Sequence, residues 1–190
     1  MATILKPGDG FLYMKVGTHA QETLADIVAR KRKEIEEAGY ALWGYGGNTC
    51  HPLSMVQPFA RDYVKRSGRI YLCMQPMDSK HFAEPLRASK MSIDGIKWEE
   101  IPEAINCKGS RYAVIIKDLR QEEFDISLPR TKVAIGNSMG RTGDVYIAGR
   151  VDKACLEAQE GVDSGDPAEK RIHIGLVAEI VDPYAVFVKD

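Results

Sequence analysis

The sequence has neither a surplus of one charge nor a long hydrophobic run. Its 190 residues include 26 lysines and arginines against 27 aspartates and glutamates, which argues against a protein that binds duplex nucleic acid through a broad basic face. No apolar run approaches the roughly 18 residues that cross a bilayer, so we expect no membrane partner. Residues 1–8 lack the basic-then-apolar pattern of a secretory signal, and we expect a cytoplasmic protein.

Cysteines and histidines are few, and none of them are spaced as metal ligands. No two cysteines lie close enough for a zinc knuckle, and the histidines show no HxH or HExxH spacing. The residues in question are Cys50, Cys73, Cys107 and Cys155, with His19, His51, His81 and His173. Scattered thiols of this kind are typical of a reduced compartment rather than of a disulfide framework. The sequence therefore predicts no metal site and no cofactor.

Two segments carry the signals of helices. Apolar residues recur at helical intervals over residues 20–38, and Thr18 and Gln21 have the spacing of a capping box. Within that segment a basic run at residues 30–33, followed by glutamates, is typical of a solvated helix face. A second helix is expected to begin near Pro58, because proline suits a first helical turn, and to end at a Ser-Gly pair.

Strand patterns outnumber the helical ones. Strands are expected at residues 10–16, 40–43, 69–75, 112–116, 124–128 and 145–151, and a hairpin at 173–181 and 185–188. Residues 76–111, with three prolines and weak periodicity, form an irregular excursion suited to a lid or an interface. Residues 157–169 hold five acidic and no basic residues and are expected to form an exposed, mobile loop.

These patterns predict one α+β domain over residues 1–190. The expected strands are more numerous than the helices, and the clear helices lie in the first third of the chain. We therefore expect a curved, mostly antiparallel sheet that is packed by one long N-terminal helix and a second, shorter helix.

A glycine-rich segment, residues 43–52 (WGYGGNTCHP), carries the features of a nucleotide pocket. Its glycines permit a ligand to approach the backbone closely, and exposed amides ahead of a helix can hold an anion. The expected ligand contacts are the rings of Trp43 and Tyr45, the amides of Gly46 and Gly47, and the polar side chains of Asn48, Thr49 and His51. No standard phosphate-binding motif is present, and the segment also fits a tight strand-to-helix turn with Trp43 in the core.

A second glycine-rich segment, residues 136–143, joins two expected strands. Its expected phosphate contacts are Asn137, Ser138, Arg141 and Thr142, among which the arginine supplies a charge-assisted fork. A plain hairpin loop is the alternative for this segment. If the two glycine-rich segments converge in space, they would form opposite walls of one site.

An enzymatic interpretation requires a nucleophile and a base. Cys50 and His51 are neighbours in the sequence, so in an extended chain their side chains point apart. Cys50 could instead pair through the fold with His19 or His81, and His19 or His51 could serve as a general base. No familiar hydrolase motif is present, and the sequence favours a binding protein over an enzyme.

Two strings, residues 11–20 (FLYMKVGTHA) and 43–52 (WGYGGNTCHP), resemble segments of small proteins of bacteria and their phages to which no activity is assigned. The resemblance implies a setting in which nucleotide signals of antiviral defence are sequestered. Residues 13–15 (YMK) and 43–44 (WG) also resemble the opening of base-reading domains of the PUA/EVE type. In those domains a strand that ends in Met-Lys, a helix and a Trp-Gly loop follow one another.

The function predicted from these features is the binding, without chemistry, of a small nucleotide-like, phosphate-bearing ligand such as a defence-signalling nucleotide. An enzyme that acts on a similar ligand with a histidine base is one alternative. A PUA-like reader of a modified or flipped base is another. A homo-oligomer is expected, because the excursion and the apolar C-terminal segment offer more surface than one small core covers.

Overall fold

The fold combines helices with one large sheet, as the sequence patterns predict. A computed structural model describes residues 4–47, 50–81, 86–148 and 151–190. Its strands are β1 (Gly10–His19), β2 (Ala41–Gly44), β3 (Tyr71–His81), β4 (Lys90–Ser92), β5 (Glu99–Glu100), β6 (Tyr112–Ser127), β7 (Thr131–Val133), β8 (Lys153–Ala158) and β9 (Arg171–Lys189). Its helices are α1 (Leu24–Ala38), α2 (Leu53–Ser67) and α3 (Gly143–Tyr146), with a 3-10 turn η1 (Leu128–Arg130).

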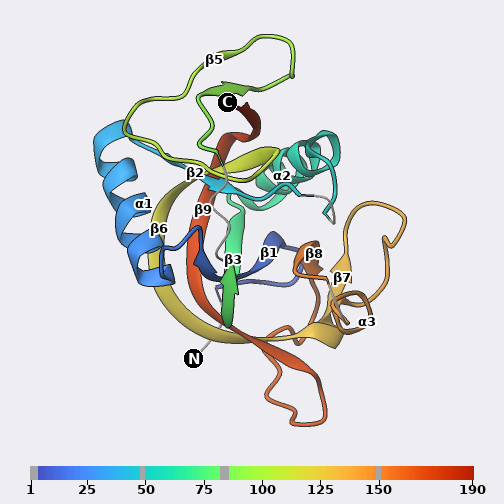
Figure 1. Ribbon diagram of the computed structural model, residues 1–190. Helices are drawn as coiled ribbons and strands as arrows, with labels where there is room; N and C mark the ends of the chain where they lie inside the picture. The colour runs from blue at the N-terminus through green and yellow to red at the C-terminus, as the bar shows by residue number, and fades with distance from the viewer. Residues whose placement is uncertain (1–3, 48–49, 82–85, 149–150) are drawn as a thin grey trace.

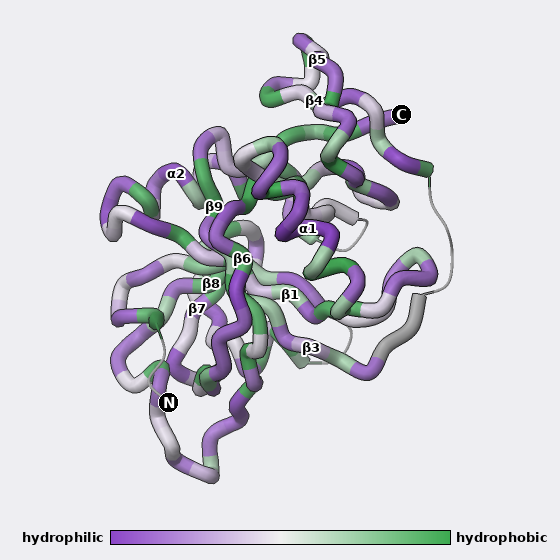
Figure 2. The backbone as a smooth tube through the Cα atoms, turned by 90° about the vertical axis from the view of Figure 1, so that its left-hand side faces the viewer, coloured by the Kyte–Doolittle hydropathy of each residue, from purple (hydrophilic) through white to green (hydrophobic). Residues whose placement is uncertain are grey.

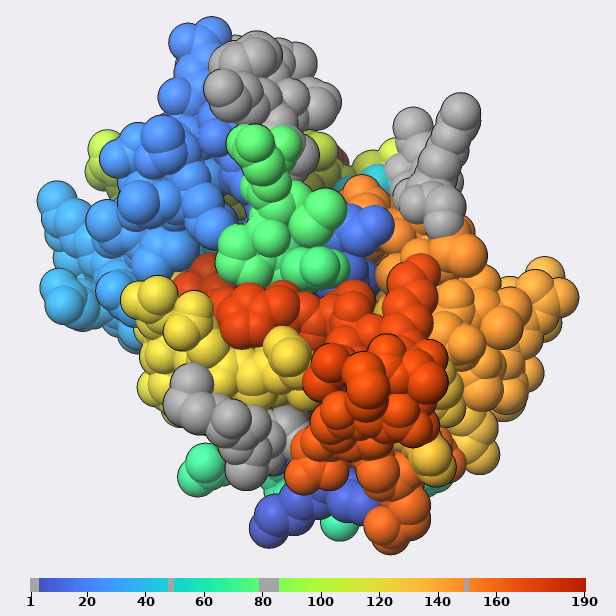
Figure 3. Space-filling view, turned by 90° about the horizontal axis from the view of Figure 1, so that it is seen from below, coloured from blue at the N-terminus to red at the C-terminus, as the bar shows by residue number. Residues whose placement is uncertain are grey.

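The nine described strands form one sheet in the order β2-β6-β9-β3-β1-β8-β7, with β4 paired to β9 and β5 paired to β4. Only β1 and β3 pair in parallel among these strands, and the other pairings are antiparallel. The sheet is not closed, since β2 and β7 form its two ends. Figure 1 shows β6 and β9 as long, bent ribbons that run beside each other, with α1 next to the bend. Seen from below, β6, β9 and β3 lie next to one another across the molecule (Figure 3).

The alternation of side chains along the strands explains how both faces of the sheet are covered. Leu12 and Met14 of β1 belong to a buried cluster that contains residues of α1 and α2. Phe11 and Tyr13, which point the other way, belong to a second cluster built from β6, β8 and β9. Hydrophobic residues are therefore concentrated where the strands cross the middle of the molecule, and hydrophilic ones in the surrounding loops (Figure 2).

The 76–111 excursion begins in β3, and its residues from Ala88 onward cover one end of the sheet. Its buried apolar residues pack on strands β2, β6 and β9 in a third cluster; they are Ala88, Ile101, Ile105 and Cys107. Burying one isoleucine side chain contributes about 1.5–3 kcal/mol, so Ile101 and Ile105 help to attach this irregular segment to the domain. No helix in the described part of the chain is both long enough and apolar enough to cross a membrane.

Helix α1 begins later than its pattern predicts, and the predicted capping box is wrong. The N-cap is Thr23, whose side chain accepts a hydrogen bond from the Asp26 amide at 3.2 Å while the Asp26 carboxylate accepts one from the Thr23 amide at 3.3 Å. Thr18 instead lies in β1, because pairing with β3 continues as far as His19. A tight turn then joins His19 to Glu22 through two backbone hydrogen bonds. The predicted stop at the helix end is confirmed by a left-handed glycine cap.

Helix α2 begins at Leu53, not near Pro58, and it has 15 residues, the same length as α1. Pro58 lies inside the helix, where it removes one backbone hydrogen bond. The helix tolerates this loss because one of its faces is packed into the core. The buried residues of that face are Leu53, Val56, Phe59, Ala60 and Tyr63.

Two strand predictions in the C-terminal half are also wrong. The segment 145–151 begins in helix α3 rather than in a strand, and Tyr146 donates its amide hydrogen to the Thr142 carbonyl. The predicted C-terminal hairpin is one strand, β9, both halves of which pair with β6. Its Asp182-Pro183 pair lies at a register shift in that pairing instead of in a turn. The first error arises because a short apolar run does not distinguish a helix from a strand, and the second because such runs do not reveal their partner strands.

Candidate functional site

A cavity of about 430 Å³ lies where β1, α1 and the end of β2 meet the segment 106–110. Val16 of β1 and Trp43 of β2 both line it, although three strands separate β1 from β2 in the sheet order. Two strands that are not neighbours in the sheet therefore meet at one cavity. Its volume falls within the range of roughly 300–1,000 Å³ that is usual for small-molecule sites.

The walls of the cavity carry more positive than negative charge. The basic residues that line it are Lys15, Arg30, Lys31, Lys108 and Lys153, and the acidic ones are Glu22 and Asp152. This local excess contrasts with the net charge of −1 for the whole chain. The Lys153 Nζ atom lies 3.8 Å from where a Cβ on Gly47 would stand, so its ammonium group is beside the first glycine-rich segment. Such a cavity favours an anionic ligand.

A buried ionic network lies behind one wall, on α1. Arg30 donates two hydrogen bonds to the Glu22 carboxylate, at 2.8 and 3.0 Å, and a third to Glu34 at 3.0 Å. Lys31 lies 3.1 Å from Glu34, and both side chains are about 95% buried or more. Burial lowers the pKa of Lys31 despite the opposing attraction of Glu34. Hydrogen bonds from Arg30 lower the pKa of Glu22.

The network also holds the backbone of Asn106, which lines the cavity. The Asn106 carbonyl accepts from Arg30 at 3.0 Å and from Lys31 at 2.7 Å, and its amide donates to Glu34 at 2.9 Å. The side-chain Oδ1 of Asn106 is buried but makes no hydrogen bond to any described residue. Unpaired buried acceptors are uncommon in folded proteins, which makes this atom a candidate contact for a ligand.

The first glycine-rich segment contributes to the cavity with three of its predicted contact residues, Trp43, Gly46 and Gly47. Trp43, Gly44, Gly46 and Gly47 line the cavity, and Trp43 is 6% exposed. The amide of Gly46 donates to the Tyr112 carbonyl at 2.9 Å, and the amide of Gly47 donates to the Cys50 Sγ at 3.0 Å. These two amides are therefore already bonded within the protein. The predicted contacts Asn48 and Thr49 lie outside the described residues.

Tyr45 is part of the core and does not line the cavity. Its side chain is 2% exposed, and its hydroxyl donates to the backbone carbonyls of Tyr13 and Ala154 at 3.3 Å. Gly46 has no space for a side chain, since a Cβ there would lie 2.1 Å from the ring of Tyr112. Close packing against the Tyr112 ring thus accounts for part of the glycine-rich composition.

Within the described residues, the second glycine-rich segment meets the first where Gly136 lies against His51. A Cβ at Gly136 would lie 2.3 Å from the His51 Nε2 atom, so the imidazole packs directly on this glycine. The His51 ring also stacks on Tyr146, and burial lowers its pKa. The cavity wall includes neither His51 nor any residue from 136 to 143. The segments therefore converge, but next to α3 rather than around the cavity.

The polar groups of the second segment are directed to its own turn and to solvent. Gly140 and Arg141 bond through their backbones to Val133, at 2.9 and 2.8 Å. The side chains of Asn137 and Arg141 are exposed, and those of Ser138 and Thr142 are partly exposed. Thr142 is the N-cap of α3, without a side-chain cap bond.

The candidate catalytic residues are divided between two places. His19 lines the cavity, whereas Cys50 and His51 do not. The Cys50 Sγ accepts from the Gly47 amide and lies 3.8 Å from the Tyr112 hydroxyl. No group of three metal-ligating side chains is assembled within the described part of the chain.

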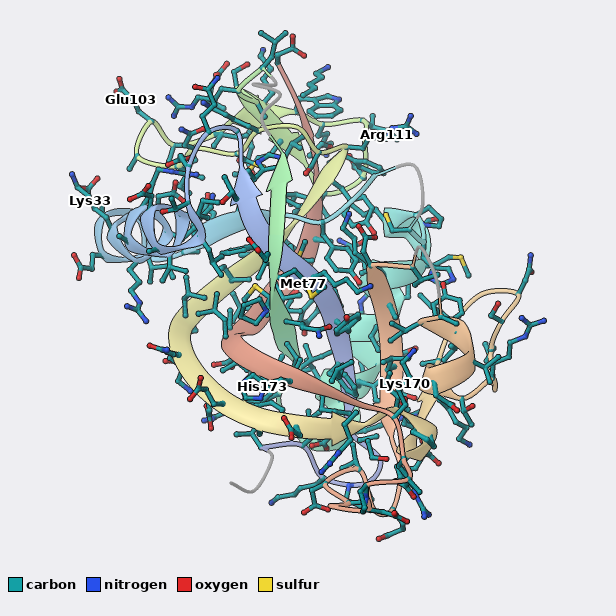
Figure 4. The ribbon with its side chains drawn as sticks, turned by 60° about the horizontal axis from the view of Figure 1, so that its bottom comes forward. Lys33, Met77, Glu103, Arg111, Lys170 and His173 are labelled. Atoms are coloured by element: carbon teal, nitrogen blue, oxygen red, sulfur yellow. The ribbon has the colours of Figure 1, made fainter. Side chains whose placement is uncertain are left out.

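Sequence reasoning missed the basic residues of the cavity and treated the 30–33 run as a solvated face. Lys33 does point away from the sheet (Figure 4), but Lys31 is buried. A signal was present in the spacing, because Lys31 and Glu34 continue the helical stripe that begins at Leu24 and Ile27. Charged residues at positions of a buried stripe predict a buried pair.

Comparison with known proteins identifies no relative of this chain. A scan of protein-family models finds no match, and neither curated proteins nor solved structures contain one. The function is therefore argued from the site itself.

Proposed function

We propose that the cavity binds a small nucleotide-like, phosphate-bearing ligand and holds it without converting it. The observation that carries the proposal is the meeting of five basic side chains and one tryptophan around a cavity of about 430 Å³. A flat apolar ring and a cluster of cations are the two features that a base and a phosphate require. Sequestration of a defence-signalling nucleotide is one use that such a protein would have.

Phosphate would be held by Lys15, Lys108 and Lys153. Lys15 and Lys153 come from neighbouring strands, since β1 pairs with β8 at Met14 and Lys153. Lys108 comes from the segment that follows Asn106, on a different side of the cavity. Cations that converge from separate elements are more specific for a phosphate group than a run on one solvated helix.

The base would be held against Trp43. This residue lines the cavity while belonging to the main buried cluster, so its ring is held in place by packing on its other side. A fixed ring loses little conformational freedom when a base stacks on it, and stacking on an aromatic ring contributes about 1–3 kcal/mol. Of the two rings expected from the sequence, Trp43 is kept as the proposed stacking residue and Tyr45 is not, because Tyr45 is enclosed in the core.

The test is calorimetric titration with AMP, adenosine and inorganic pyrophosphate. We expect AMP to bind more tightly than adenosine, which lacks the phosphate, because AMP engages both the cations and the ring. Lys153→Ala should lower the affinity for AMP by about 10- to 100-fold, the scale of a charge-assisted hydrogen bond. It should leave the affinity for adenosine unchanged. Lys170→Ala, an exposed lysine of the 159–170 loop (Figure 4), is the matched control. Absence of binding by AMP and pyrophosphate would refute the proposal.

A second candidate function, turnover of the ligand, is favoured by the position of His19. This histidine lines the cavity, where it could serve as a general base. Incubation of the protein with AMP and analysis of the products by mass spectrometry separate the two functions. Intact AMP after prolonged incubation supports sequestration, whereas breakdown that is lost in His19→Gln supports catalysis.

A further inference from the structure

Asn106 is held more firmly than its place in an irregular segment would suggest. Both of its backbone polar groups are bonded to charged side chains of α1, at distances of 2.7–3.0 Å. Lys31 and Glu34, which make two of these bonds, are buried. Three charged groups from one helix thus fix the backbone of one residue in the cavity wall.

The side-chain oxygen of Asn106, unlike its backbone, has no hydrogen-bond partner among the described residues. Its Oδ1 atom is buried and accepts no hydrogen bond from any described residue, although the neighbouring polar groups of Arg30 and Lys31 are bonded. Among the described side chains, the other buried oxygens without a hydrogen bond are Oε2 of Glu34, which lies beside Lys31, and Oδ1 of Asp144, away from the cavity. An amide oxygen that no protein group holds leaves the amide plane able to turn toward a ligand.

We propose that Asn106 determines which base the cavity accepts, by pairing its amide with the edge of adenine. This inference rests on the proposed binding of a nucleotide-like ligand. An asparagine amide offers one donor and one acceptor in a plane, and adenine offers the complementary pair, the N6 amino group and N7. Guanine offers two acceptors on the same edge, O6 and N7, so it can satisfy only the donor. Arg30, Lys31 and Glu34 are positioning residues for this contact.

The test compares AMP with GMP by calorimetric titration. The wild-type protein should bind AMP at least about tenfold more tightly, the ratio expected for one discriminating hydrogen bond. In Asn106→Asp the side chain only accepts, so it loses its bond to N7 of adenine and can accept from the N1–H and N2–H groups of guanine. The AMP-to-GMP preference should therefore fall by about 10- to 100-fold or reverse. Asn137→Asp makes the same change at an exposed position outside the cavity and should leave the preference unaltered.

Asn106→Ala provides a second variant, which removes both polar atoms and should bring the two affinities close together. Thermal unfolding of each variant checks that the fold persists. An unchanged preference in both variants, with Lys153→Ala still weakening AMP and GMP alike, would overturn the role of Asn106 while the proposed function stands. If neither nucleotide nor pyrophosphate binds the wild-type protein, the proposed function and this inference fail together.

Discussion

The two glycine-rich segments have similar compositions but different tasks in the fold. In residues 43–47 the glycines let the backbone pass close to buried aromatic rings. A side chain at Gly46 would overlap Tyr112. In residues 136–143 Gly136 and Gly140 have positive φ angles and shape a turn, and of these two only Gly136 is also packed against a side chain, that of His51. Gly140 has open space around its Cα. Glycine content therefore indicates an unusual backbone, but only the neighbours show whether packing or conformation requires it.

The largest effect should come from filling the space at Gly46. Gly46→Ala should lower the free energy of unfolding by about 3 kcal/mol, because the added Cβ meets a buried ring whose hydroxyl is bonded to the His51 carbonyl at 2.6 Å. Gly140→Ala should cost about 1 kcal/mol, since only its left-handed conformation opposes a side chain. Chemical denaturation of both variants makes the measurement. Equal losses in the two would remove the distinction between the segments.

A second contrast concerns cations and should appear in affinity rather than in stability. Lys153 lines the cavity beside Gly47, whereas Arg141 is exposed in the other segment. Lys153→Ala should reduce AMP affinity by about 1.5–3 kcal/mol, and Arg141→Ala should reduce it by less than about 0.5 kcal/mol, the range of a neutral surface change. Titration of both variants with AMP at one salt concentration shows which of the two cations contacts the phosphate. A larger loss in Arg141→Ala would move the phosphate site to the second segment.

A third test separates the two aromatic residues of the first segment. Tyr45→Phe removes a hydroxyl that donates to two backbone carbonyls, so the free energy of unfolding should fall by about 1 kcal/mol while AMP affinity is unchanged. Trp43→Phe should have the opposite balance of effects. It should lower AMP affinity more than it lowers the free energy of unfolding, because a smaller ring offers less stacking area. Thermal unfolding and titration of each variant are compared. If Tyr45→Phe lowered AMP affinity but kept its full stability, Tyr45 would have to be part of the binding site.

The smallest effect concerns pH at the point where the segments meet. Burial lowers the pKa of His51 below its ordinary value of 6.5, so the unfolded chain binds a proton more readily than the fold does. Stability should therefore be lost as pH falls below about 6.5 toward the lowered pKa. His51→Gln should flatten this dependence in unfolding experiments between pH 5 and 7.5. A dependence that persists unchanged in this variant would point to another group.

His173 supplies a control of opposite sign on β9, where it is exposed at the surface (Figure 4). A hydrogen bond to Asp125, at 2.8 Å, raises the pKa of His173. Its contribution to stability is present below pH 6.5 and is lost as pH rises through the raised pKa. Because the pair is exposed, the change should be no more than about 1 kcal/mol. His173→Gln should remove that loss and leave the acid-side effect of His51 in place.

Parts of the fold follow from local patterns. The alternation of Leu72 and Met74 with Cys73 predicts a strand covered on both faces, and the two clusters confirm it. The glycine after α1 stops the helix where the pattern ends. The start of α1 could not be predicted as well, because Thr18 and Thr23 both offer capping spacing and pairing with β3 decides between them. Local capping contributes about 1 kcal/mol, which strand pairing easily outweighs.

The amino-acid sequence by itself determined the mixture of helices and strands, the alternation that covers the sheet on both faces, and the unusual backbone of two glycine-rich segments. Tertiary structure alone decided where charge accumulates. Lys15, Lys108 and Lys153 are far apart in the chain and unremarkable in a protein with balanced charge, yet one cavity collects them. The physical reason is that long-range strand pairing places β1, β2 and β8 in one sheet, and no local window of sequence contains that pairing.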